Sequence, residues 1–246
     1  MKVIILSTDT KHHIYFINKL ADYFNIEGVI YERKRLVKSY PTGPFFSQEE
    51  DSFEERFFDH RHGGTRSYIV PEIFERLIDV FDINQKGIAE YLKALDPDLF
   101  ISFGVGMIKP HIFNIPRWGT INVHRGISHE YRGLDSDLWA IWQKRFDLIG
   151  ITVHYVNEAL DTGDILAQET ILIEPDDEIF HLRYKTTLSA TRMIIQVLER
   201  IKKERRPIKG APQKKIGAYY TAMHVNKKYE ALANFTEYKR ILRNAR

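Results

Sequence analysis

The chain has 246 residues, 43% of them hydrophobic and 28% charged, which is ordinary for a soluble globular protein. Lys and Arg number 36 against 33 Asp and Glu, and this formal net charge of +3 is too small to indicate nucleic-acid binding by itself. The absence of cysteine excludes disulfides, thiolate catalysis and cysteine-ligated zinc, and it suits a reducing cytoplasm, where we expect the protein to reside. The opening segment MKVIILSTDTKHH has an apolar run too short for a signal peptide or a membrane span.

The first half of the chain alternates short β-branched runs with helical patterns. The predicted helices are HIYFINKLADYF (13–24) and residues 84–98, helical until Pro97. The predicted strands are KVIILS (2–7), IEGVIYE (26–32), DLFISFG (98–104) and GTINVH (119–124). Alternation of this kind favours a mostly parallel sheet covered by helices.

A long irregular stretch separates the second and third predicted strands. Within it, FFSQEEDSFEERFF (45–58) predicts a helix, because Ser47 and Glu50 have the spacing of a capping box. Its aromatic residues could cover a cleft, but packing in the core or at an interface is the more ordinary interpretation. No pattern assigns a role to residues 40–68 as a whole.

Two basic or histidine-containing segments in this stretch raise functional questions. ERKRLVK (32–38) follows the second strand and could meet a diphosphate, yet a solvated basic loop is the more ordinary interpretation. His60 and His62 lie in a polar loop with no further patterned ligand, which is more typical of solvated histidines than of a metal site.

The pattern changes after Gly150. GITVHYV (150–156) and ILAQETILI (165–173) predict two strands whose connection is too short for a helical crossover, so we expect an antiparallel pair. A long amphipathic helix over residues 177–203 then packs back on the sheet. We predict a catalytic domain over residues 1–204, followed by a short extension over 205–246 that contains a loop, a strand and a final helix.

INVHRG (121–126) places Asn122 and His124 two positions apart at the end of an apolar run. In an extended segment, side chains two apart share a face, so both polar groups point the same way. Ligands of open α/β sheets bind just beyond the carboxyl ends of the parallel strands. That is where these two residues fall if GTINVH is a central strand.

The same rule points to the loop that follows the neighbouring strand. This loop consists of Phe103, Gly104, Val105, Gly106, Met107 and Ile108. Its two glycines let a flat ligand approach the backbone, and its apolar side chains offer walls. On spacing alone, a plain turn into a short helix that starts near Pro110 explains the loop at least as well.

A third polar group comes from ITVHYVNEALDTGDILAQ (151–168), where a strand carrying His154 leads into a loop that delivers Asp161. An Asp beside a Gly in a loop is usually a turn former. A carboxylate brought close to His124 would instead orient the imidazole and favour its protonated form. An Asn, a His and an Asp that converge on one cleft can stabilise an oxyanion and move protons.

NVHRGISHEYRG, followed by GITVHYVNEALDTGDILAQ, resembles the formyltransferase family that uses 10-formyltetrahydrofolate. The resemblance is dense from about Asp98 to Ile173. It implies a Rossmann-like α/β fold with a mostly parallel twisted sheet, helices on both faces, an antiparallel strand pair after the catalytic strand and a small C-terminal extension. Carried over residue by residue, the catalytic Asn, His and Asp of the family fall on Asn122, His124 and Asp161.

The resemblance also implies the chemistry. Asn122 and protonated His124 would donate hydrogen bonds to the formyl oxygen, while Asp161 would hold His124 cationic and help to take the proton that the attacking amine loses. No metal and no covalent enzyme intermediate are required. The pterin of the folate would lie against the Phe103–Ile108 loop and against a second loop that contains Val156, Asn157 and Leu160.

Departures from the family bear on the acceptor amine. Glycinamide ribonucleotide formyltransferase has a glycine-rich first turn for the substrate phosphate, whereas LSTDTKHHI (6–14) contains no glycine. Methionyl-tRNA formyltransferase carries a C-terminal barrel domain for tRNA, whereas only residues 205–246 follow the long helix here. The compact core with its short aromatic segment AYY (218–220) is most similar to sugar N-formyltransferases, and we expect a nucleotide-linked (dTDP) amino sugar. The residues expected at the acceptor are Thr8, His12, Arg132 and Gly133.

Plainer interpretations of some residues and other functions stay open. His12 and His13 at the start of the first helix are more typical of solvated residues, and Arg132 could simply pair with a carboxylate. Other activities are formylation of glycinamide ribonucleotide or hydroxyornithine, and hydrolysis of the folate; hydrolases of the family carry an extra N-terminal domain, whereas this chain starts on its first strand. A binding protein without turnover is a further alternative, as is a metal hydrolase built on His124, His129 and Asp161. We expect neither nucleic-acid nor membrane partners, and aromatic residues near the tail would suit a homodimer.

Overall fold

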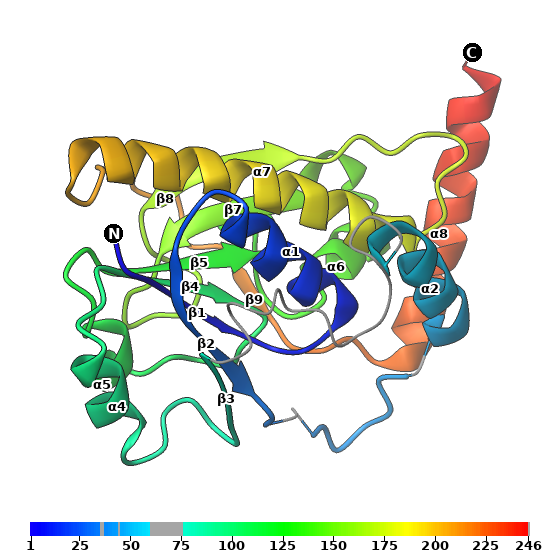
Figure 1. The fold of residues 1–246 in the computed structure, drawn as a ribbon. Coiled ribbons are helices and arrows are strands. Elements are labelled where there is room, and N and C mark those ends of the chain that lie inside the picture. Colours follow the sequence, from blue (N-terminus) through cyan, green and yellow to red (C-terminus); the bar gives the residue numbers. More distant parts are fainter. Residues whose placement is uncertain (35–36, 44, 60–75, 246) are drawn as a thin grey trace.

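The computed structural model describes residues 1–34, 37–43, 45–59 and 76–245. A seven-stranded sheet with the order β3-β2-β1-β4-β5-β7-β8 forms its centre (Figure 1). The strands are β1 (Val3–Ser7), β2 (Ile26–Glu32), β3 (Leu77–Val80), β4 (Leu99–Phe103), β5 (Thr120–His124), β7 (Gly150–Tyr155) and β8 (Ile165–Thr170). Only β7 runs against its neighbours, because it pairs antiparallel with both β5 and β8 while the remaining pairs are parallel. The predicted α/β fold with a mostly parallel sheet and an antiparallel strand pair is therefore confirmed.

The central strands are covered on both faces. β1 and β4 are buried along their whole length, and β1 lies between β2 and β4. Strands with this double cover consist of nearly continuous apolar residues, as VIILS and LFISF do. The serine that ends β1, Ser7, donates its hydroxyl hydrogen bond to the Phe103 carbonyl at 2.8 Å and so ties the carboxyl ends of the two strands together.

Two helices cover one face of the sheet and two shorter ones cover the other (Figure 1). On the first face, α1 (Lys11–Ala21) and α7 (His181–Glu204) pack against odd-numbered residues of β1, β4 and β5. The buried side of α7 has helical spacing and consists of Ala190, Met193, Ile194, Val197 and Ile201. On the opposite face, α4 (Ile88–Ala94) and α5 (Pro110–Phe113) pack on even-numbered residues of β1 and β4.

A second, smaller group of elements lies beyond the end of β5. Its members are the two-stranded sheet of β6 (Tyr131–Gly133) and β9 (Ala218–Tyr220), helix α6 (Ser136–Trp142), the 3-10 helix Phe146–Leu148 and helix α8 (Val225–Asn244). α8 buries Ala231 and Phe235 in the same apolar cluster as Leu138 and Ile141 of α6. The predicted short strand and final helix of the tail are thus confirmed, and the strand pairs in parallel with β6.

The 45–58 segment forms a helix, but not with the predicted capping box. Helix α2 (Ser47–Glu54) has Phe46 as its N-cap residue, without a side-chain capping hydrogen bond, and continues as the π-helix Glu55–Asp59. Glu50 is used elsewhere, because its Oε1 lies 3.0 Å from Nε of Arg183 on α7. The aromatic residues of the segment pack on α7, with the ring centroids of Phe53 and Tyr184 5.4 Å apart.

Two short strands, β3 and β6, were not predicted from the sequence. Of the basic segment 32–38, residues 35–36 lie outside the described part of the chain, as do His60 and His62. None of the helices among the described residues combines the length and the apolar character needed to cross a membrane.

Candidate active site

Three polar side chains of the sheet share one face near the end of β5. Asn122 and His124 lie on β5, and His154 lies on β7, where it pairs in register with Asn122. Their alternate neighbours Val123 and Val153 point to the opposite face and join the main core. The period of two in a strand therefore separates the core residues from the polar ones, as the sequence predicted for Asn122 and His124.

Asp161 reaches this face from the loop between β7 and β8. Its backbone has a φ of 55°, a left-handed conformation that is uncommon outside glycine, and its carbonyl accepts a hydrogen bond from Gln213 Nε2 at 2.9 Å. The carboxylate is 5% exposed. Oδ2 accepts the Gly133 N–H at 2.9 Å, which anchors the side chain to the end of β6. The loop thus holds the carboxylate in one position at the cost of local backbone strain.

The carboxylate of Asp161 lies between two imidazoles. Its Oδ2 is 3.5 Å from Nδ1 of His124, its Oδ1 is 3.5 Å from Nε2 of His154, and Oδ1 also lies 3.3 Å from Nδ2 of Asn122. Burial alone raises the pKa of the Asp161 carboxyl, but the two imidazoles and the Gly133 N–H outweigh it and hold this pKa below its ordinary value. The predicted convergence of Asn122, His124 and Asp161 is therefore found, with His154 as a fourth member.

The hydrogen bonds of His124 define which ring nitrogen can face a ligand. Nε2 lies 2.8 Å from the backbone carbonyl of Tyr131, which can only accept, so Nε2 carries a hydrogen and donates it there. Nδ1 faces the Asp161 carboxylate. Each ring nitrogen thus has an oxygen acceptor beside it.

The loop after β4, residues 103–108, contains a glycine that no other residue can replace and apolar side chains beside it. Gly104 has a φ of 86°, and a Cβ atom there would lie 2.2 Å from Cε1 of His13, so only glycine fits. Val105 and Ile108 pack in one apolar cluster with Val156, which brings together the two loops predicted for the pterin. The side chain of Met107 remains 57% exposed beside them. The loop thus combines a glycine backbone with one exposed apolar side chain.

The second predicted loop is held in part by its own side chains. Thr162 donates its hydroxyl hydrogen bonds to Asn157 Oδ1 at 2.8 Å and to the Ala159 carbonyl at 3.0 Å. The Leu160 carbonyl accepts a hydrogen bond from Nη1 of Arg132 at 3.1 Å. The loop that carries Asp161 is therefore tied to β6 by a side chain as well as by the backbone.

His12 and His13 are buried, so the interpretation of both as solvated residues is wrong. Each is 5% exposed, because the rings lie under the loop after β4, with the centroid of His13 4.5 Å from that of Phe103. Thr8 Oγ1 lies 2.6 Å from Nδ1 of His13. Burial, the adjacent His13 and the positive charges of two arginines lower the pKa of His12, and burial with the same arginines lowers the pKa of His13 to about 3. Both imidazoles are neutral over the physiological range.

Those arginines are Arg125, which follows His124 in the chain, and Arg183, which lies on α7. Arg125 pairs with Asp137 at 2.5 Å. Arg183 pairs with Glu54 at 2.5 Å and with Glu50 at 3.0 Å. Both arginines near His12 and His13 are therefore paired with carboxylates.

Among the described residues Arg132 pairs with no carboxylate, contrary to the plain alternative. Its Nε donates to the Gly217 carbonyl at 2.6 Å, and its Nη1 to that of Leu160. Gly133 has a φ of 92° and presents its N–H to Asp161, while the ring of Tyr219 covers it from β9 and stays 56% exposed. Arg132 and Gly133 thus hold the loop that carries Asp161.

The first two cations of the basic segment after β2, Arg33 and Lys34, have acidic partners. Arg33 forms ion pairs with Asp9 and Asp79, and Lys34 lies 2.5 Å from Asp82. Acidic partners thus neutralise Arg33 and Lys34, two of the cations of this segment.

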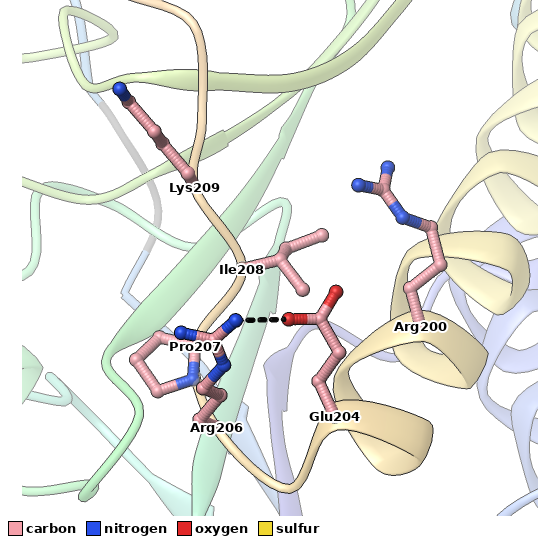
Figure 2. A pocket seen from close by; sticks show the side chains of 6 residues that line it. All are labelled: Arg200, Glu204, Arg206, Pro207, Ile208 and Lys209. Atoms are coloured by element: carbon pink, nitrogen blue, oxygen red, sulfur yellow. Dashed lines mark ion pairs between the residues drawn. The ribbon is translucent and has the colours of Figure 1, made fainter.

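A surface hollow of about 400 Å³ lies away from these residues, at the C-terminal end of α7 (Figure 2). It is lined by Arg200, Glu204, Arg206, Pro207, Ile208 and Lys209. Arg206 turns to Glu204, with which it forms an ion pair at 3.1 Å. None of the residues predicted for the site lines this hollow. Within the described part of the chain, no three His, Asp or Glu side chains are grouped so that they could hold a metal ion.

His154 is the site residue that the sequence did not assign. Its position in the apolar strand GITVHYV could have pointed to it, because a buried histidine needs a polar partner. Its partners became visible only once β7 was known to pair with β5, where His154 lies opposite Asn122.

Comparisons with known proteins agree with this geometry. A family model described as formyl transferase matches residues 67–198. The methionyl-tRNA formyltransferase of Sulfurihydrogenibium sp. (strain YO3AOP1) is 36% identical over 121 residues, which is 49% of this chain and 39% of that protein. The matching part of the chain spans less than half the length of this and of two further methionyl-tRNA formyltransferases.

Solved structures resemble the chain over nearly all of its length. A sugar N-formyltransferase from Shewanella sp FDAARGOS_354 has a TM-score of 0.63 and 16% identity, covering 95% of this chain and 87% of that one. The formyltransferase PseJ from Anoxybacillus kamchatkensis, solved with UDP-4,6-dideoxy-4-formamido-L-AltNAc and tetrahydrofolate, has a TM-score of 0.54 and 18% identity, covering 94% and 100%. Likeness at such low identity shows the fold alone. Because the family model matches more than half of its residues, the chain belongs to the formyl transferase family.

Proposed function

We propose that the protein transfers the formyl group of 10-formyltetrahydrofolate to the primary amine of a nucleotide-linked amino sugar, with a dTDP-sugar as the first candidate. The observation that carries this proposal is the meeting of Asn122, His124 and Asp161 around one point beyond the end of β5. An amide, an imidazole and a carboxylate at this point are the groups that formyl transfer to an amine needs.

The reaction forms a bond between the amine nitrogen and the formyl carbon, and breaks the bond between that carbon and N10 of the folate. In between, the carbon is tetrahedral and its oxygen carries negative charge. Nδ2 of Asn122 and Nδ1 of His124 are the donors for this oxygen, because Nε2 of His124 is already bonded to Tyr131. Losing one such donor costs about 3 kcal/mol of transition-state stabilisation in comparable sites.

Both donors must turn partly from their present partners to the substrate oxygen. The contacts that they make now are long, 3.3 Å from Asn122 to Asp161 and 3.5 Å from His124 to Asp161, and catalytic hydrogen bonds often tighten only when substrate is bound. The attacking amine loses one proton, and the leaving N10 gains one. Asp161, held ionised by its neighbours, assists this transfer and orients the His124 ring through Nδ1.

Support for the folate comes from the loop after β4 and from the family. The loop offers backbone groups and the exposed Met107 beside the apolar Val105 and Ile108. A structural neighbour, PseJ, was solved with tetrahydrofolate.

Support for a sugar acceptor comes from the structural neighbours, two of which are titled as a sugar N-formyltransferase and as a 4-N formyltransferase. The curated relatives act on methionyl-tRNA, which makes this the second candidate. Those relatives are more than twice as long as the segment that matches.

The test is to incubate the protein with 10-formyltetrahydrofolate and a panel of acceptors. The panel should contain dTDP-, UDP- and GDP-linked amino sugars, glycinamide ribonucleotide, hydroxyornithine and methionyl-tRNA. Tetrahydrofolate and a formylated sugar detected by mass spectrometry are the expected products. Formylation of methionyl-tRNA alone would replace the sugar with the second candidate, and formate released without any formylated acceptor would mean a hydrolase. The Asn122→Ala variant is the control for non-enzymatic transfer.

A further inference from the structure

The carboxylate of Glu32 ends β2 in a buried position and binds two backbone N–H groups from elsewhere in the chain. Glu32 is 6% exposed. Its Oε2 accepts the N–H of Gly106 at 2.6 Å, and its Oε1 accepts the N–H of Ile83 at 3.1 Å. Hydrogen bonds from N–H groups to an ionised carboxylate are among the stronger ones in proteins. Glu32 thus fixes the loop after β4 from the far side of β1.

Asn84 holds the same loop two residues further on. Its Nδ2 donates to the Met107 carbonyl at 2.9 Å, and its Oδ1 accepts the N–H of Lys109 at 2.8 Å. Asn84 is itself held in place, because its N–H and its Nδ2 both bond to Oδ1 of Asp82 at 2.8 and 3.0 Å. Its amide therefore has a defined orientation.

The strand order explains why these two side chains reach the loop. β4 and β2 lie on either side of β1, and β3 lies beyond β2. The loop after β4 crosses the carboxyl end of β1 and meets side chains from β2 and from the turn after β3. At its start, Gly104 presses on the ring of His13. The loop is therefore fixed at three points along six residues, which is unusual for a surface loop and leaves little freedom for its backbone groups.

We propose that Glu32 and Asn84 are positioning residues for the one-carbon donor: they fix the backbone of residues 104–109 in the shape that binds the pterin of the folate. The inference rests on the proposed function. A loop whose recognition groups are its own N–H and carbonyl groups binds a rigid ring well only if its backbone is ordered before the ligand arrives. Glu32 and Asn84 supply this order without touching the ligand.

The role of Glu32 depends on its being an acceptor at both oxygens. In Glu32→Gln one of the two oxygens becomes an NH2 group, which cannot accept from Gly106 or from Ile83. Either Gly106 or Ile83 then loses its acceptor, so the bridge that Glu32 makes between the loop and Ile83 is broken while the volume of the side chain stays the same. Asn84→Ala removes the second anchor independently. Glu27→Gln, on the same strand but at its opposite end, is the matched control for the loss of a charge from β2.

The experiment measures binding of tetrahydrofolate by titration calorimetry, together with kcat and KM for 10-formyltetrahydrofolate at a saturating concentration of the acceptor. In Glu32→Gln and in Asn84→Ala we expect the Kd for tetrahydrofolate and the KM for the donor to rise together by about tenfold, the scale of one lost hydrogen bond. We expect kcat to change by less than about threefold, because the loop acts on binding of the donor and not on the transition state. Glu27→Gln should behave as the wild type.

The outcomes separate this inference from the proposed function. If the wild type binds tetrahydrofolate and both variants bind it equally well, the positioning role is wrong and the function stands. A fall in kcat with an unchanged KM also overturns the role. If the wild type does not bind tetrahydrofolate at all, the proposed function fails first. Circular dichroism and the Tm report whether each variant is folded, and if Glu32→Gln is not, Asn84→Ala decides the question.

Discussion

Asn122 and His154 face each other across β5 and β7, with Nδ2 of the amide 3.3 Å from Nε2 of the imidazole. His154 Nδ1 lies 2.8 Å from the carbonyl of Tyr155 and must donate to it. Where Nε2 carries no hydrogen, it accepts from the Asn122 amide; where it carries one, it faces Oδ1 of Asp161 at 3.5 Å. With His154 as the acceptor, the NH2 group of Asn122, and not its oxygen, faces the carboxylate of Asp161. Without such a partner, the amide oxygen and nitrogen could be exchanged.

Replacing His154 should therefore disturb catalysis through Asn122 and Asp161. We expect His154→Leu, which has no acceptor, to lower kcat by about tenfold or more and to leave the KM for the donor nearly unchanged. His154→Gln keeps an acceptor oxygen on a side chain of comparable reach and should recover part of the activity. Steady-state kinetics with both variants make the comparison. Equal activity in the wild type and His154→Leu would show that the contact is only structural.

Asn122→Ala should lower kcat by roughly 10²-fold to 10³-fold, because it removes a donor to the charge that develops in the transition state. Binding of tetrahydrofolate should change little, since the amide makes this bond mainly while the formyl carbon is tetrahedral. Asn114→Ala, at an exposed position after α5, serves as the control. Calorimetry and single-turnover kinetics separate the two effects, and a variant that loses folate binding in proportion to its rate would assign Asn122 to the ground state instead.

Asp161→Asn should remove most of the activity and also change how stability depends on pH. The folded protein holds the pKa of Asp161 below its ordinary value, so ionisation of this group stabilises the fold. That stabilisation is present above the unfolded pKa near 4 and is lost as the pH falls further. The free energy of unfolding should therefore differ more between wild type and variant at pH 7 than at about pH 3. Denaturant titrations at the two values test this, and a constant difference would contradict it.

Glu50 should show the opposite dependence. Burial, with a smaller contribution from the Glu54 charge, raises the pKa of Glu50 to about 7 even though Arg183 lies beside it. Because the folded state favours the protonated form, stability should fall as the pH rises from about 4.5 to 7. Glu50→Gln should remove this dependence and stabilise the protein above pH 7 by roughly 1 to 3 kcal/mol. Thermal unfolding from pH 5 to 8 measures the effect, with Glu49→Gln, exposed on the same helix, as the control. A wild-type Tm that rises with pH over this range would contradict the raised pKa.

Much of the architecture could be predicted because the central strands carry strong local signals. VIILS and LFISF are continuous apolar runs, and α7 repeats its apolar residues with helical spacing. β3 and β6 gave no such signal. LIDV is a short edge strand with a charged residue, and YRG pairs only with β9, which lies far away in the sequence. Pairing between distant segments cannot be read from local periodicity.

The same limit applies to the site. The alternation in GTINVH was enough to predict that Asn122 and His124 share a face, and a family resemblance joined Asp161 to them. The burial of His12 and His13 could not be predicted, because it depends on the loop after β4 folding back over α1. Glu32 looked like the first residue of a solvated basic segment. Its buried carboxylate becomes intelligible only when the N–H groups of Gly106 and Ile83 lie beside it.

The strand order also bears on dissecting this protein into pieces. Residues 67–198, which carry the match to the family, include β3 and β4 but neither β1 nor β2, the two strands that separate them. A fragment cut to that match would leave β4 with an open edge and β3 with no neighbour, and unpaired edges of this kind invite aggregation. A fragment meant to carry the proposed active site must therefore keep β1 and β2, although neither strand contains Asn122, His124 or Asp161.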